Sequence, residues 1–164
     1  MSKRFNLREF QQGLLDRMQL QVQKGNQVAT LGILIGKGNW LVDMADISEV
    51  LAVPKLTTVP LTKSWYSGVA NVRGNIYNIT DLGAYMEYGQ TALDVQSRVL
   101  LIGQKFNINS GLLVSKVLGL RNASEWLSSE KNGLLTFQDG TGQKWNKLDI
   151  KQLLQQPEFI QIGV

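Results

Sequence analysis

The 164-residue chain contains no cysteine and no histidine. Without cysteine it forms no disulfide, and without histidine it lacks the usual base of Ser–His and Cys–His nucleophiles. Most zinc and iron sites also take their ligands from these two residue types. We therefore expect no metal and no cofactor. Hydrolysis by two carboxylates stays open as an alternative, because it needs only acidic side chains.

Long apolar runs are also absent, and no segment approaches the roughly 20 apolar residues of a membrane-spanning helix. The first four residues, Met1-Ser2-Lys3-Arg4, lack the apolar centre of a signal peptide. We therefore expect a cytoplasmic protein with no direct membrane insertion. An apolar content of 43% is ordinary for a globular protein. The length suits one domain, or two small lobes that share a core.

The charge balance is basic, with 17 Lys and Arg against 13 Asp and Glu and a net charge of +4. A basic surface is typical of nucleic-acid binders. A strand-binding groove, however, combines a basic stripe with aromatic residues, and here the cations are scattered. The isolated cations include Lys24, Lys37, Lys55, Lys63, Lys105 and Lys116. A solvated basic surface is favoured, and a small-barrel nucleic-acid binder remains the alternative.

The 16 glycines lie between short apolar runs, which favours short strands joined by tight turns. The runs 29–36 and 40–44 flank a turn and predict a β-hairpin. A second hairpin is expected around Asp139-Gly140-Thr141-Gly142. Further segments are predicted as strands at 47–51, 98–103 and 111–118, a turn of helix at 124–128 and a helix at 147–156.

The N-terminal residues carry the signals of a helix start, with Asn6 and Glu9 as a capping box and Phe5 and Phe10 as a hydrophobic staple. An apolar stripe at helical spacing follows, formed by Leu7, Phe10, Leu14, Leu15, Met18 and Val22. We expect an amphipathic helix over about 7–24, within an N-terminal segment 1–25. We expect its stripe to pack on the body of the domain, and docking on a partner is the alternative.

The most specific stretch runs from Trp65 to Leu82. Its β-branched residues predict a strand with one buried face. Gly74 interrupts the pattern, and a glycine inside a strand marks a bulge or the close approach of another backbone. Asp81 is placed to cap a short helix over 82–87.

Arg73, just before that glycine, is a long and permanently charged side chain. One possible role is a structural ion pair with a nearby carboxylate such as Asp81. The other is contact with a partner. Asp43, Asp46 and Glu49 form a further group of acids, which we expect to be solvated charges.

The order of residues in this stretch resembles the signature of the CheW-like family, the adaptors of bacterial chemosensory arrays. That signature is an aromatic residue, then G-V-x-N-x-R-G, a short apolar strand and an Asp-Leu pair. The matching residues here are Trp65, Gly68-Val69, Asn71, Arg73-Gly74 and Asp81-Leu82. Asn78 stands where the family usually has a proline, which affects the expected edge geometry of the strand.

The resemblance implies a mainly β fold of two SH3-like five-stranded β-barrel lobes. The lobes share an apolar core, and a short helix closes each. The implied CheW-like domain spans 26–164, with lobes of about 29–90 and 95–164 between which strands can cross over. An internal echo, in which Leu34-Ile35-Gly36 recurs as Leu101-Ile102-Gly103, is consistent with two similar lobes.

The resemblance further implies a non-catalytic adaptor that joins the cytoplasmic tip of a chemoreceptor to the regulatory domain of a CheA-type histidine kinase. The helical extension is more typical of adaptors in type IV pilus twitching systems. Receptors of the family dock in the groove between the barrels. The implied partner-binding residues are Asn71, Val72, Arg73, Gly74, Ile76, Ile79 and, facing these from the second lobe, Leu112 and Val114. The implied structural signature is Trp65, Gly68, Asp81 and Leu82.

Overall fold

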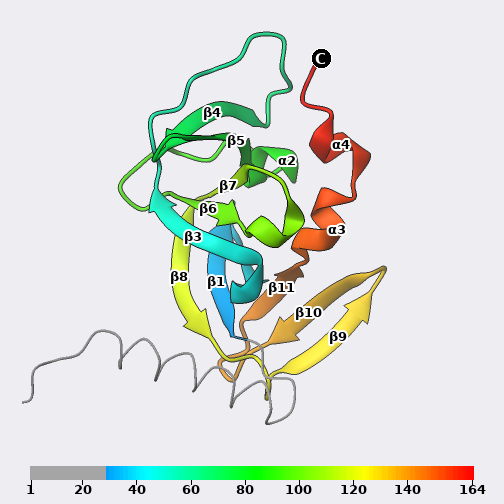
Figure 1. Cartoon of the computed structure of the whole chain (residues 1–164). Coiled ribbons are helices and arrows are strands. Elements are labelled where there is room, and N and C mark those ends of the chain that lie inside the picture. The colour runs from blue at the N-terminus through cyan, green and yellow to red at the C-terminus, as the bar shows by residue number, and fades with distance from the viewer. Residues whose placement is uncertain (1–28) are drawn as a thin grey trace, which may run out of the picture.

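A computed structural model describes residues 29–164 (Figure 1). The expected helix over 7–24 and the segment 1–25 lie outside the described residues. Within residues 29–164, eleven strands form two sheets, and the helices are short. No helix in this range is long and apolar enough to cross a bilayer.

The first sheet has six strands and the second has five. The six-stranded sheet has the order β8 (Lys116–Arg121), β1 (Thr30–Ile35), β2 (Gly38–Asp43), β11 (Lys144–Leu148), β10 (Leu134–Gln138) and β9 (Leu127–Lys131). The five-stranded sheet has the order β3 (Ile47–Ala52), β6 (Arg98–Ile102), β7 (Ser110–Val114), β5 (Asn75–Asp81) and β4 (Tyr66–Val72). The helical elements are η1 (Met44–Asp46), α2 (Leu82–Tyr85), η2 (Gln104–Phe106), α3 (Ile150–Leu154) and α4 (Pro157–Ile160).

These sheets confirm the expected two-lobe, mainly β fold. One difference is the sixth strand of the first sheet. Residues 124–128 were expected to form a turn of helix, but β9 begins at Leu127 and pairs with β10 through the two-residue turn Asn132-Gly133. The local helix signal is overridden because β9 gains a ladder of hydrogen bonds along one side of β10.

The strands cross between the sheets along the chain. In the six-stranded sheet, β1 pairs with β8 and β2 pairs with β11. The next strand in the chain, β3, pairs instead with β6 in the five-stranded sheet. Each sheet therefore draws strands from both halves of the chain, and the sheets do not follow the lobe limits of 29–90 and 95–164. Sheet membership is decided by non-local hydrogen bonds and by the shared core, which sequence order does not encode.

The core lies between the sheets and also within the five-stranded sheet. On β6, Leu100 and Ile102 belong to the cluster between the sheets, whereas Val99 and Leu101 belong to the second cluster. Successive side chains of a strand point to opposite faces. Because both faces of β6 and β7 are buried, these strands read as continuous apolar runs rather than as alternating ones.

Two short helices begin at aspartates in equivalent places of the chain. The Asp81 carboxylate accepts a hydrogen bond from the Ala84 N–H at 3.2 Å, and Asp149 accepts one from Gln152 at 3.1 Å. These bonds satisfy N–H groups that have no partner within the helix. The residue after each aspartate, Leu82 or Ile150, is fully buried in the core between the sheets. The expected N-cap at Asp81 is thus confirmed, whereas the helix predicted for 147–156 is shorter and spans only Ile150–Leu154.

The C-terminal helices pack beside α2 (Figure 1). Trp65 stacks on Phe159 with ring centroids 6.3 Å apart, and Tyr85 meets both rings edge-on. The last residues then run beside the loop that precedes β4, where the Lys63 N–H donates to the Ile162 carbonyl at 2.8 Å. Trp65 therefore joins the end of the chain to the five-stranded sheet.

Candidate protein-binding site

The centre of the candidate site is the tight turn between β4 and β5. Val72 pairs with Asn75, so Arg73 and Gly74 alone form the turn. Both have positive φ, 50° and 87°, as a type I′ turn requires. The Asn71 side chain accepts a hydrogen bond from the Gly74 N–H at 2.9 Å and supports this conformation.

Gly74 therefore lies in the turn between two strands and does not mark a bulge within one, contrary to the sequence-based expectation. No backbone approaches it closely either, because a Cβ placed there would meet nothing within 4 Å. The irregularity in this ladder lies at Gly68, where the register shifts and φ is 121°. A Cβ at Gly68 would lie 2.2 Å from the Thr57 carbonyl oxygen, so both conformation and space require glycine there.

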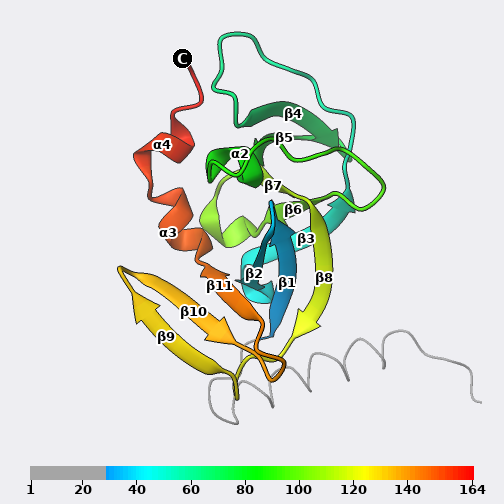
Figure 2. The ribbon, with the colours of Figure 1, turned by 180° about the vertical axis from the view of Figure 1, so that it is seen from behind.

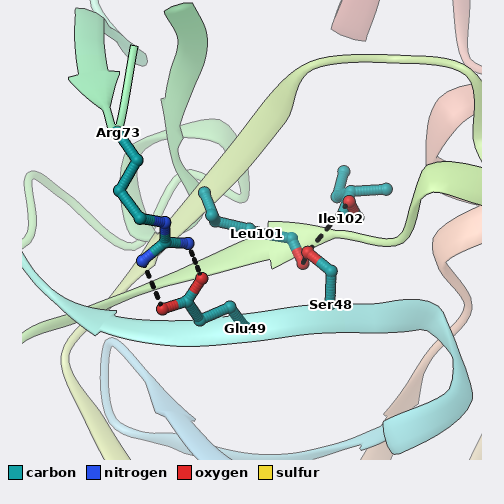
Figure 3. A network of polar contacts seen from close by, with 5 residues as sticks. All are labelled: Ser48, Glu49, Arg73, Leu101 and Ile102. Carbon is teal, nitrogen blue, oxygen red and sulfur yellow. Dashed lines mark hydrogen bonds and ion pairs between the residues drawn. The ribbon is translucent and has the colours of Figure 1, made fainter. Parts of the chain in front are cut away.

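Arg73 extends from the turn toward β3 and forms a two-pronged ion pair with Glu49 (Figure 3). Its Nη1 donates to Glu49 Oε1 at 3.0 Å, and Nη2 donates to Oε2. The hydrogen bond from Arg73 lowers the pKa of Glu49, and the same bond raises the pKa of Arg73. The Arg73 side chain remains 67% exposed, so solvent and other proteins can reach it.

The suggested pairing of Arg73 with Asp81 is wrong. Asp81 is buried, and its carboxylate accepts hydrogen bonds from the Ala84 N–H, the Thr91 N–H and the Thr91 hydroxyl. These bonds commit Asp81 to the start of α2 and to the loop that follows it. Proximity in sequence suggested the wrong partner because the strand carries Asp81 away from the turn.

The eight implied partner-binding residues divide into exposed and buried sets. Asn71, Arg73, Gly74 and Ile76 are exposed at the end of the β4–β5 hairpin, and Ile76 is 53% exposed. Val72, Ile79, Leu112 and Val114 are buried. Val72 is 9% exposed and the other three have no accessible surface, so the candidate surface consists of the exposed set.

Leu112 and Val114 also differ from expectation in where they lie. They were expected to face the signature from the other lobe, but β7 pairs in parallel with β5 within the same sheet. Both side chains belong to the cluster between the two sheets. They therefore lie beside β5 with their side chains in the core and do not form an opposite wall of a groove.

The four signature residues have structural roles that the geometry explains. Trp65 packs against Phe159, Gly68 allows the close approach of Thr57, Asp81 caps α2, and Leu82 fills the core. All four lie at the end of the β4–β5 hairpin opposite the Arg73-Gly74 turn, so they anchor the base of the hairpin.

Near the hairpin, Ser48 holds the edge of β3. Its hydroxyl lies 3.3 Å from the Leu101 carbonyl oxygen and 3.5 Å from that of Ile102 (Figure 3). The β3–β6 register shifts between Ile47 and Glu49. Glu49 follows this irregularity directly, and no local sequence signal distinguishes it from the other acids.

The three acids that were expected to be solvated are each paired with a distant cation. Asp46 pairs with Lys105 at 2.6 Å, Asp43 pairs with Lys147, and Glu49 pairs with Arg73. Within the described residues, no group of three or more acids is arranged to hold a metal ion. These acids are therefore ion-paired and not simply solvated charges as the sequence suggested.

Comparison with known proteins adds family information. The model of the CheW-like domain matches residues 29–158. Protein PilI of Pseudomonas aeruginosa is 30% identical over 142 residues, which cover 82% of this chain and 79% of PilI. Protein FrzA of Myxococcus xanthus is 32% identical over 76 residues, which cover 46% and 47% of the two chains.

A solved structure has the same fold. The crystal structure of the scaffolding protein TtCheW from Thermoanaerobacter tengcongensis matches with a TM-score of 0.69. The match covers 83% of this chain and 97% of TtCheW at 17% sequence identity.

Proposed function

This chain belongs to the CheW-like domain family, and from that membership we propose that it is a non-catalytic adaptor of a chemosensory array. Its partners are the cytoplasmic tip of a methyl-accepting chemoreceptor and the regulatory domain of a CheA-type histidine kinase. The adaptor is recruited from the cytoplasm to membrane-associated receptor arrays and binds no nucleic acid. This role requires surfaces that bind proteins, and no catalytic group.

The observation that carries this proposal is the exposed end of the β4–β5 hairpin within a CheW-like fold. Arg73 presents a guanidinium at a two-residue turn. Asn71 of β4 and Ile76 of β5 are cross-strand partners close to this turn. Protein interfaces combine apolar side chains with arginine and other polar groups, and this turn presents both kinds. The surface that we assign to the receptor is therefore Asn71, Arg73, Gly74 and Ile76.

The Arg73–Glu49 pair fits this role because it is exposed. Exposed ion pairs contribute little to folding, since water already solvates both charges well. Arg73 can therefore leave Glu49 for a partner carboxylate without loss of the fold. A guanidinium also binds a carboxylate through two parallel hydrogen bonds, which adds orientation to the contact.

We assign the adaptor to a system that controls type IV pili and twitching motility. The match to PilI spans most of both chains, whereas the match to FrzA spans less than half of each. The sequence before residue 29 also carries an amphipathic helix pattern, which is more typical of the pilus-associated adaptors.

A pull-down with the tagged full chain from its source cell tests the proposal directly. We expect mass spectrometry to identify a chemoreceptor and a CheA-type kinase among the captured proteins. Capture of neither protein, in a preparation where the tagged chain is folded, would contradict the adaptor role. A filter-binding titration at two salt concentrations tests the nucleic-acid alternative, which predicts binding that falls steeply with salt.

A further inference from the structure

A second surface feature lies on the six-stranded sheet, which does not contain the Arg73 turn. An open cavity of about 520 Å³ is formed where the chain enters β9 and leaves β10. The β9–β10 hairpin extends away from the body of the molecule in both views (Figure 2). Its principal polar and aromatic lining residues are Asn122, Glu125, Trp126, Gln138 and Asp139.

The charge of this cavity is opposite to that of the chain as a whole. Two carboxylates line it, and none of its described lining residues is Lys or Arg. The chain nevertheless has a net charge of +4. The cavity is therefore an acidic concavity on a basic protein, and such a site attracts a cation through electrostatic complementarity.

One of these carboxylates is fixed in place. Asp139 Oδ1 accepts from the Thr141 N–H at 2.9 Å, the Thr141 hydroxyl at 2.6 Å and the Gln143 N–H at 3.0 Å. Oδ2 accepts from the Trp145 indole N–H at 3.0 Å and has a second lone pair. Asp139 thus offers a preorganised negative charge at the edge of the cavity.

The aromatic wall provides a second kind of contact. Trp126 is half-buried, and its ring centroid lies 5.6 Å from that of Trp145. The Arg121 guanidinium already lies over the Trp145 ring, 5.6 Å from its centroid. Guanidinium groups stack on indole faces through cation–π attraction and planar contact. Trp126 can therefore receive a second guanidinium in the same manner.

We propose that this cavity binds an arginine side chain of a partner protein. Glu125 and Asp139 neutralise its charge, and Trp126 stacks on its plane. The Asn122 amide oxygen, which accepts from the Ser124 N–H at 3.1 Å, and the Gln138 amide oxygen can each accept a further hydrogen bond. Arginine fits better than lysine because only a planar guanidinium combines stacking with paired hydrogen bonds. This docking site is independent of the receptor surface at Arg73, so either can fail alone.

The direct test is a titration of the full chain, followed through the tryptophan indole N–H signals in NMR spectra. The probe is Nα-acetyl-arginine amide, and the matched control is the citrulline analogue, which has nearly the same shape without the charge. We expect a saturable shift of the Trp126 signal with the arginine probe, and binding of the citrulline analogue at least about fivefold weaker. Equal binding of the two probes would overturn the proposal.

Variants identify the site. Glu125→Gln and Trp126→Leu should each weaken binding of the arginine probe by about two- to fivefold, because each removes one contact with the guanidinium. Glu130→Gln makes the same charge change on β9 outside the cavity lining and should leave binding unchanged. Equal effects of Glu125→Gln and Glu130→Gln would assign the binding to general charge. A third probe, Nα-acetyl-lysine amide, tests the choice of a guanidinium, and affinity equal to that of the arginine probe would overturn that choice.

Discussion

Arg73 and Glu49 connect the two opposite edges of one sheet. Glu49 lies on β3, the first strand in the order of the five-stranded sheet, and Arg73 directly follows β4, the last. A flat sheet would hold these edges far apart, so their contact shows that the sheet curls into a barrel. The interior is filled by a cluster that includes Ala70, Val72 and Leu101. The ion pair thus lies where the barrel closes.

Reversal of the charge at Arg73 should abolish receptor binding and leave the fold intact. Arg73→Glu removes an exposed ion pair, which contributes little to stability, and it repels a partner carboxylate. Co-sedimentation with receptor-containing membranes measures binding, and circular dichroism measures folding. Lys105→Glu is the matched control because it breaks another surface ion pair, that with Asp46. Unimpaired co-sedimentation of Arg73→Glu would reject the role of Arg73.

A charge swap separates the ion pair from the binding role. The double variant Glu49→Arg with Arg73→Glu can form the pair again in the reverse order. We expect it to remain unable to bind the receptor, because the partner meets a carboxylate at the turn. The same co-sedimentation assay checks this. Restored binding would show that barrel closure, and not the guanidinium itself, is what the receptor requires.

Two apolar residues of the implied site should behave in opposite ways. Ile76→Ala should weaken receptor binding with little effect on stability, because this side chain is 53% exposed. Leu112→Ala should lower the free energy of unfolding by about 2–5 kcal/mol, because truncation of a fully buried leucine leaves a cavity. The Leu112→Ala molecules that remain folded should still bind the receptor. Urea unfolding and co-sedimentation below the melting temperature measure both effects, and a stable Leu112→Ala protein that fails to bind would contradict this division.

The loop after β10 should make stability depend on acid pH. Hydrogen bonds, above all that from the Thr141 hydroxyl, lower the pKa of Asp139 to about 2. Because its pKa is lower in the folded state, Asp139 stabilises the fold above its ordinary pKa near 3.8. This stabilisation is lost as the pH falls toward 2.

Asp139→Asn should therefore be less stable than the wild type at pH 7, and the difference should shrink toward pH 2. Urea midpoints at pH 7, 4 and 2 test this. Glu130→Gln, on the exposed β9, is the control. A difference that stays constant over this range would show that the Asp139 charge does not contribute.

Gly68→Ala should destabilise the fold by about 2 kcal/mol or more. The new Cβ would clash with the Thr57 carbonyl, and φ at this position is strongly positive. Gly140→Ala is the control because a Cβ there meets nothing within 4 Å. Thermal melts of both variants provide the test, and equal melting temperatures would contradict the close packing at Gly68.

The sequence alone predicted features that depend on neighbouring residues. The hairpin of β1 and β2 follows from two apolar runs and the turn between them. The helix start at Asp81 follows from a carboxylate that accepts a hydrogen bond from the N–H three positions ahead. The order of residues between Trp65 and Leu82 also indicated the family. Each of these signals lies within a few residues of its effect.

Only the tertiary structure decided which strands pair, which side chains are buried and which acid meets Arg73. Glu49 and Arg73 come together because the sheet curls, and Leu112 is buried because β7 lies between β5 and β6. The acidic cavity likewise joins the loop before β9 to the turn after β10. These outcomes depend on how segments far apart in the sequence pack together. The periodicity of a sequence shows only which side chains of one segment share a face.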